Sequence, residues 1–251
     1  MWFFFNLGCR ARFRWRLQQC FVCHKLGRIF VIKLRNRFDI PLAQCLLSAA
    51  SYAYFPASGY DVSAYPWAPP TAPARAAAVG VRQVFESDDY LATLAAVPAS
   101  SALILAFRGT VFQTWKEKIT NVLQPDVGSI ATTNFQQRVN PNAPSSWQVA
   151  EGFANSYLAI QTEILSALET ATGSSKPTLF ITGHSLGSAM AVIAAMDIKL
   201  RMGSSFNDIR VMVFAPPRAG TAEFKAAVEE HFPDSKMYLF QNYFDQVPHG
   251  T

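Results

Sequence analysis

The sequence predicts an α/β fold in which a mostly parallel central sheet carries helices on both faces. Two observations support this prediction. Between residues 101 and 241, short apolar runs of strand length alternate with longer stretches whose apolar residues recur at helical spacing. In addition, the 251 residues are 50% hydrophobic, which is ample for the core of one α/β domain.

Each element follows from a local pattern. Leu42, Leu46 and Leu47 recur at helical spacing, whereas residues 101–107 form a continuous apolar run, as expected of a strand buried on both faces. The predicted helices cover residues 40–54, 111–123, 147–172, 185–202 and 222–231. The predicted strands cover residues 80–87, 90–97, 101–107, 179–181, 209–214 and 237–241. Residues 55–78 and 124–146 contain several prolines and glycines and are predicted to be loops.

The charge distribution divides the chain into an N-terminal extension, residues 1–38, and a domain, residues 39–251. The extension carries nine basic residues and no acidic one, so the domain has a net charge of −4 and is not expected to bind nucleic acid. Arginines interleaved with aromatic residues are compatible with contact at an anionic membrane surface. The alternative is a weakly structured upstream segment. The apolar residues precede the arginines, unlike a secretory signal peptide, and no apolar run reaches transmembrane length, so we assign no compartment.

The four cysteines all lie in the first fifth of the chain and give no disulfide framework for the domain. The segment Cys20-Phe21-Val22-Cys23-His24 matches the short pattern of covalent haem attachment. We interpret this as a chance match, because the surrounding residues do not resemble a small helical cytochrome and a zinc site would need a second pair of ligands. The sequence therefore predicts no cofactor and no metal.

The candidate site is centred on Gly183-His184-Ser185-Leu186-Gly187, which lies between an apolar strand and a helix rich in small residues. This is the setting of a nucleophile elbow, where a serine at a strained bend exposes its hydroxyl above the sheet. Glycines flank the serine because the strand and the helix approach too closely for a β-carbon. The alternative is a glycine-rich turn with an incidental serine.

A serine that attacks a carbonyl needs hydrogen-bond donors for the oxyanion, a base, and a carboxylate that orients the base. The amide of Leu186, directly after the serine, is one candidate donor. Thr110 is the other, because Phe107-Arg108-Gly109-Thr110 leaves a predicted central strand. By itself the segment is equally consistent with an ordinary turn at a strand end.

Taken together, these motifs resemble the class 3 lipase family, the fungal triacylglycerol lipase type of α/β-hydrolase. The resemblance covers residues 101–249 in the family's order. It comprises Phe107 to Thr110, Trp115, Glu151-Gly152-Phe153 with Tyr157, Gly183 to Gly187, Phe214 to Gly220 with Ala215 in place of a glycine, and Asp245-Gln246-Val247-Pro248-His249. The resemblance implies an α/β-hydrolase that cleaves carboxylic esters, particularly acylglycerol lipids. It also implies Ser185 as nucleophile, Asp245 as triad acid, Thr110 and Leu186 as oxyanion donors, and residues 111–123 as a lid.

The base is where the sequence departs from the family. The family's catalytic histidine lies tens of residues beyond its aspartate, whereas only six residues follow Asp245. We therefore expect a domain that is truncated at its C-terminal end, with the base beyond this chain, and negligible ester hydrolysis by the 251 residues; His249 is the less favoured candidate. The rival hypothesis is a non-catalytic protein on a lipase scaffold that binds lipid or another partner.

Overall fold

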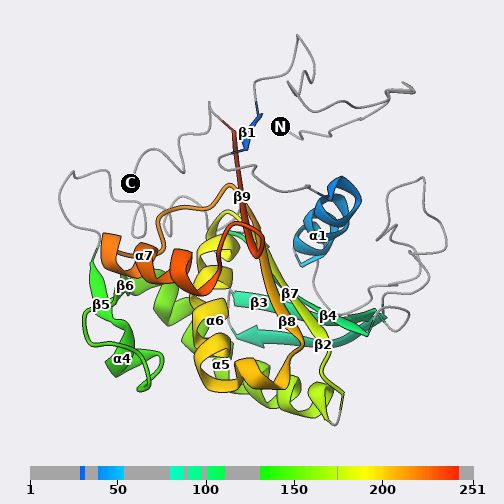
Figure 1. The fold of residues 1–251 in the computed structure, drawn as a ribbon, viewed down its shortest axis with the longest axis horizontal. Helices are drawn as coiled ribbons and strands as arrows, with labels where there is room; N and C mark the ends of the chain where they lie inside the picture. Colours follow the sequence, from blue (N-terminus) through cyan, green and yellow to red (C-terminus); the bar gives the residue numbers. More distant parts are fainter. Residues whose placement is uncertain are drawn as a thin grey trace.

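The computed structural model of the chain describes residues 29–31, 39–53, 80–87, 90–97, 101–110, 131–173 and 175–242 (Figure 1). Its strands are β1 (Ile29–Val31), β2 (Gly80–Ser87), β3 (Tyr90–Val97), β4 (Ala102–Phe107), β5 (Thr132–Asn134), β6 (Gln148–Ala150), β7 (Thr178–His184), β8 (Asp208–Phe214) and β9 (Met237–Asn242). Its helices are α1 (Ile40–Tyr52), α4 (Phe135–Arg138), α5 (Glu151–Thr172), α6 (Leu186–Met202), the 3₁₀ turn η3 (Gly203–Ser205) and α7 (Ala222–His231).

In the described part of the chain, seven strands form the main sheet in the order β1-β9-β8-β7-β4-β3-β2. The four neighbouring strands β4, β7, β8 and β9 run parallel to one another. At the two sides of the sheet the pairing is antiparallel, between β1 and β9, between β3 and β4, and between β2 and β3. The predicted α/β fold with a parallel centre and flanking helices is confirmed. Because they run parallel, β4, β7, β8 and β9 all have their carboxyl ends on the same side of the sheet. The serine of the candidate site is on this side.

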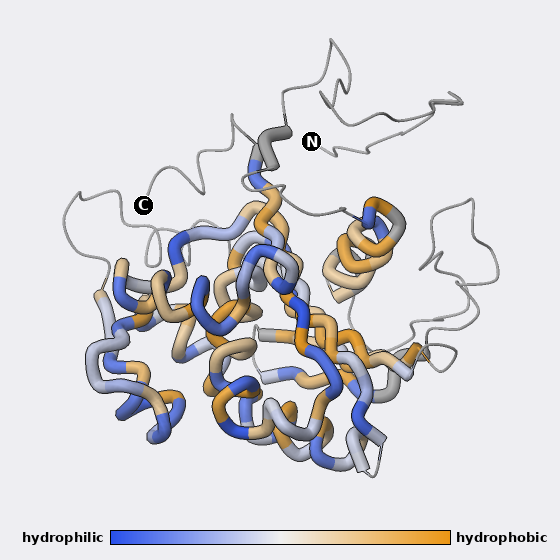
Figure 2. Tube along the Cα trace, viewed as in Figure 1, coloured by the Kyte–Doolittle hydropathy of each residue, from blue (hydrophilic) through white to orange (hydrophobic). Residues whose placement is uncertain are grey.

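The two faces of the sheet bury two separate cores, as the alternation of side chains along a strand requires. In β4, Leu103 and Leu105 belong to the larger core shared with α5 and α6. Ile104 and Ala106 belong to the smaller core beneath α1, where Leu46 is completely buried. Figure 1 shows α1 on the other side of the sheet from α5 and α6, and in Figure 2 hydrophobic residues run through the central strands and α1.

The loop predicted over residues 124–146 and the start of the helix predicted over 147–172 differ from the structure. Within the described part of that loop, β5 pairs with β6 and α4 lies between them. Residues 148–150 are therefore a strand, and α5 begins at Glu151, whose N–H donates to Ala131 O at 2.8 Å. Elements of three or four residues are too short to show a hydrophobic period, so tertiary pairing decides them.

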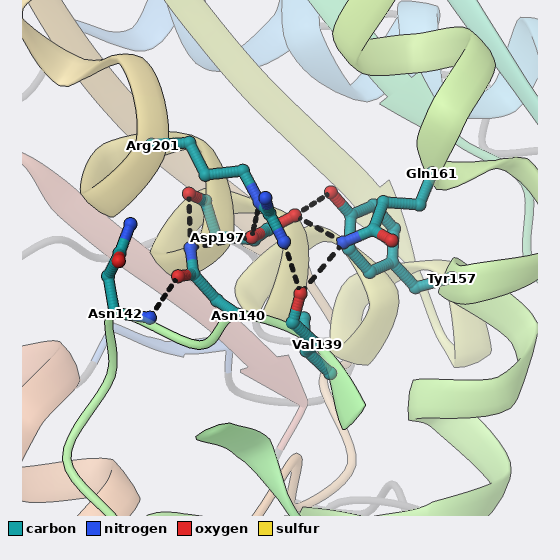
Figure 3. A network of polar contacts seen from close by, with 7 residues as sticks. All are labelled: Val139, Asn140, Asn142, Tyr157, Gln161, Asp197 and Arg201. Carbon is teal, nitrogen blue, oxygen red and sulfur yellow. Dashed lines mark hydrogen bonds and ion pairs between the residues drawn. The ribbon is translucent and has the colours of Figure 1, made fainter. Parts of the chain in front are cut away.

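A buried carboxylate connects α6 to its surroundings (Figure 3). Asp197 is completely buried in α6, and its carboxylate accepts four hydrogen bonds, at 2.6 to 2.8 Å, from Asn140, Tyr157, Gln161 and Arg201. A buried charge is stable only when its hydrogen-bonding capacity is satisfied, and here it is. Burial, followed by the charge of Asp197 and its hydrogen bond, raises the pKa of Tyr157 well above its ordinary value, so the phenol stays a donor.

Candidate active site

Ser185 occupies a sharp bend between β7 and α6. Its backbone has φ 54° and ψ −124°, a conformation that an L-residue rarely adopts and that costs about 1–3 kcal/mol. Its N–H donates to Phe214 O at 2.9 Å, so the end of β8 helps to hold the bend. The side chain is half-buried rather than enclosed in the core. The residue predicted to be a nucleophile therefore has the backbone geometry that the elbow motif requires.

The flanking glycines are required by backbone contacts on both sides of Ser185. A β-carbon on Gly183 would lie 2.3 Å from Gly187 O. A β-carbon on Gly187 would lie 2.4 Å from Phe107 O and 2.6 Å from Arg108 O. Real β-carbons do not approach other atoms this closely, so both positions exclude any side chain. The first turn of α6 therefore lies directly against the end of β4.

This contact brings the two predicted oxyanion donors to the same region. Leu186 is the first residue of α6, and Thr110 is two residues beyond Arg108, whose backbone meets Gly187. Arg108 N–H donates to Leu91 O at 2.9 Å, which holds the start of the segment against β3. Leu186 and Thr110 are both half-buried. The structure thus places Ser185, Leu186 and the Arg108 to Thr110 segment around one edge of the sheet.

The segment after β8 completes the described surroundings of the bend. Ala215 has φ 50°, and its N–H donates to Phe240 O at 2.7 Å. Further along, Ala219 O accepts from Ala150 N–H at 2.9 Å, and Thr221 N–H donates to Gln148 O at 3.0 Å. The segment is therefore fixed between β9 on one side and the small sheet of β5 and β6 on the other. The sequence patterns did not predict the strained backbone at Ala215. The signal was present, because Ala215 replaces a glycine of the family motif over Phe214 to Gly220.

Several predicted features lie outside the described residues. They are Asp245, His249, the lid predicted over residues 111–123, and the Cys20-Cys23-His24 pattern. Of the two described histidines, His184 ends β7 and His231 ends α7. The Nδ1 atom of His231 lies 3.0 Å from Ala227 O, and its ring packs edge-on against Trp147 with centroids 5.7 Å apart. Within the described ranges, no group of three or more His, Cys, Asp and Glu side chains is arranged to bind a metal.

A serine on a strained strand-to-helix bend, at the carboxyl edge of a parallel sheet, defines this molecule as an α/β-hydrolase in fold. The family model described as "Lipase (class 3)" matches residues 104–251, which is more than half of the chain. The chain belongs to the class 3 lipase family, as its motifs predicted.

Curated relatives and solved structures agree with this family. The chain is 28% identical over 154 residues to the secreted mono- and diacylglycerol lipase MDL3 of Malassezia globosa, covering 59% of this chain and 46% of that protein. It is 33% identical over 98 residues to the secreted mono- and diacylglycerol lipase LIP4 of Malassezia restricta, covering 39% and 32%. The chain therefore spans less than half the length of these relatives.

Two fungal lipase structures show the same fold. The Lip2 lipase of Yarrowia lipolytica superposes with a TM-score of 0.67 at 22% identity, covering 83% of this chain and 72% of that one. The lipase of Rhizopus microsporus var. chinensis superposes with a TM-score of 0.62 at 19% identity, covering 83% and 67%. At these identities the likeness concerns the fold alone. No helix among the described residues has both the length and the hydropathy needed to cross a membrane.

Proposed function

We propose that this protein is a serine hydrolase of carboxylic esters, with acylglycerol lipids as the substrate class. The observation that carries the proposal is the backbone of Ser185, which is held at φ 54° at the start of α6 with Gly187 pressed against the end of β4. Membership of the class 3 lipase family supports the reaction class. The names of the relatives, mono- and diacylglycerol lipases, support the substrate class.

In the proposed reaction the Ser185 hydroxyl attacks the ester carbonyl and gives its proton to a histidine base. The amides of Leu186 and Thr110 donate to the oxyanion, and the N-terminal end of α6 adds the favourable field of its dipole. Collapse of the tetrahedral intermediate releases the alcohol, which takes the proton from the histidine. Water then cleaves the acyl-serine, releasing the fatty acid and restoring the Ser185 hydroxyl.

Asp245 is the proposed triad acid that orients the base. It follows Asn242, the last residue of β9, by three positions, and β9 runs parallel to β8. β9 therefore ends on the same side of the sheet as β7, which leads into Ser185. This supports the assignment of Asp245. We assign the base to a histidine outside the described residues, since His231 packs against Trp147 at the end of α7 and His184 is the flanking residue of the bend itself.

Covalent capture tests the proposal. A fluorophosphonate probe should label the protein at Ser185, as located by mass spectrometry, and Ser185→Ala should remove the label. Ser175→Ala provides the matched control, because Ser175 is an exposed serine outside the bend and its loss should leave labelling unchanged.

Hydrolysis of a p-nitrophenyl ester and of emulsified diacylglycerol is measured alongside. The assay is run with and without imidazole, which supplies a general base in solution. Ser185→Ala gives the background rate. A folded protein with neither Ser185-dependent labelling nor Ser185-dependent hydrolysis under any of these conditions would overturn the proposal and favour a binding role.

A further inference from the structure

Ser188 places a buried hydroxyl beside the bend, and the proposed reaction makes no use of it. The residue is completely buried in the first turn of α6. Its Oγ lies 2.9 Å from Gly183 O and 2.6 Å from Phe214 O. Its N–H donates to Ser185 O at 2.9 Å. Ser188 therefore contacts the chain before the nucleophile, the nucleophile itself and the neighbouring strand.

Two donors converge on the carbonyl of Phe214. One is the N–H of Ser185 at 2.9 Å, and the other is the hydroxyl of Ser188 at 2.6 Å. The same carbonyl belongs to the peptide that leads into Ala215, where φ is 50°. The peptide group between Phe214 and Ala215 therefore contacts one strained residue, Ser185, and is bonded to another, Ala215. The hydroxyl of Ser188 donates to the carbonyl of this same peptide group.

We propose that Ser188 is a positioning residue that keeps the strained backbone of Ser185 in its reactive orientation by fixing the Phe214 carbonyl. The inference rests on the proposed role of Ser185 as nucleophile. The single hydroxyl proton serves one carbonyl at a time, and the shorter contact identifies Phe214 as its main acceptor. Strained conformations persist only where their surroundings over-determine them, and Ser188 supplies one of those restraints.

Ser188→Ala removes the restraint while keeping the β-carbon and the helix. The Phe214 carbonyl then keeps the Ser185 N–H but loses its second donor, so the bend is free to relax. A small displacement of a reacting group lowers the rate strongly, and we expect covalent labelling of Ser185 to slow by about tenfold or more. The probe concentration that gives half-maximal rate should stay unchanged, because Ser188 does not reach the surface.

Ser156→Ala is the matched control. Ser156 is also a buried helical serine, 2% exposed, and its Oγ donates to Gly152 O at 2.7 Å within its own helix, α5. Both substitutions remove one buried hydroxyl and one hydrogen bond to a backbone carbonyl. They should therefore lower the urea midpoint to a similar extent, and only Ser188→Ala should change the reactivity of Ser185.

Amide hydrogen exchange gives a readout that does not depend on catalysis. In Ser188→Ala the amide of Ser185, which donates to Phe214 O, should exchange about tenfold faster than in the wild type, whereas Ser156→Ala should leave it unchanged. Equal exchange at Ser185 in the two variants, or equal labelling rates, would overturn the positioning role. If the wild-type protein shows no Ser185-dependent chemistry, the proposed function fails, and the exchange comparison still decides whether Ser188 restrains the bend.

Discussion

Three non-glycine residues in the described part of the chain have a positive φ, namely Ser101, Ser185 and Ala215. At Ser185 the strain accompanies the proposed nucleophile, and the surrounding hydrogen bonds explain how it persists. Ala215 is different, because its methyl group has no chemical role in the proposed reaction. Its position corresponds to a glycine in the class 3 motif, so the strain there is a cost of the side chain alone.

Ala215→Gly should therefore stabilise the protein. A left-handed backbone costs an L-residue about 1–2 kcal/mol, and the greater freedom of glycine in the unfolded chain offsets part of the gain. We expect the free energy of unfolding to rise by about 0.5–1 kcal/mol, measured by urea denaturation. Ala219→Gly is the control: Ala219 lies in the same segment without a positive φ, so its replacement should destabilise. A loss of stability in Ala215→Gly would contradict this account.

At the scale of elements, the carboxylate of Asp197 joins α5, α6 and the turn after α4. Arg201 and Gln161 also donate to Val139 O, at 2.7 and 3.1 Å, so the network fastens the turn as well as the two helices (Figure 3). Since the helix that carries Asp197 begins directly after Ser185, the network also fixes the far end of the element that supports the site.

Tyr157→Phe tests this network. The substitution keeps the ring, which packs edge-on against Phe107 with centroids 6.3 Å apart, and removes the hydroxyl that donates to Asp197 at 2.8 Å. A hydrogen bond to a charged group contributes about 1.5–3 kcal/mol, and we expect a loss of that size in the free energy of unfolding. Thr170→Val, which removes an exposed hydrogen bond from the same helix, should cost much less. Equal losses in the free energy of unfolding of the two variants would show that the hydrogen bond from Tyr157 to Asp197 adds no more stability than an exposed one.

Sequence patterns predicted the elements with a strong hydrophobic period and missed those fixed by tertiary contacts. The continuous apolar run of β4 and the glycine-flanked bend at Ser185 carry their own local signals, so strand, turn and helix were all predictable there. The short strands β5 and β6 have no such signal, because each exists through the other and through the segment after β8. Arg201 is four residues from Asp197 in the same helix, a spacing that sequence does report. The other partners of Asp197 are 36 to 57 residues away, and no local pattern reports contacts at that separation.

At the scale of the whole molecule, the order of the parallel strands explains why the site residues are far apart in sequence. Thr110 follows β4, Ser185 follows β7 and Ala215 follows β8, and these three strands are neighbours in the sheet. The hydrogen bonds between strands therefore determine the spacing of the segments around Ser185. The amino ends of these strands lie on the opposite side of the sheet, away from Ser185.

Asp208, the first residue of β8, lies at that opposite edge and makes the stability of the whole fold depend on pH. Its carboxylate accepts from Arg210 Nε at 2.8 Å and from Lys236 Nζ, just before β9. Partial burial alone would raise the pKa of Asp208, but the hydrogen bonds and charges of Lys236 and Arg210 outweigh burial and hold the pKa below its ordinary value. Because the pKa is lower in the folded state than in the unfolded chain, the stabilisation is complete at neutral pH.

That stabilisation should be lost as the pH falls below about 4, where the unfolded chain binds a proton more readily than the folded protein does. Asp208→Asn removes this difference in proton binding. The free energy of unfolding, measured in urea from pH 7 to pH 3, should therefore fall less steeply in the variant than in the wild type. Thr170→Val, which removes an exposed hydrogen bond but no titratable group, should keep the wild-type slope. Parallel curves for wild type and Asp208→Asn would show that the ion pairs of Asp208 do not contribute to the stability of the sheet.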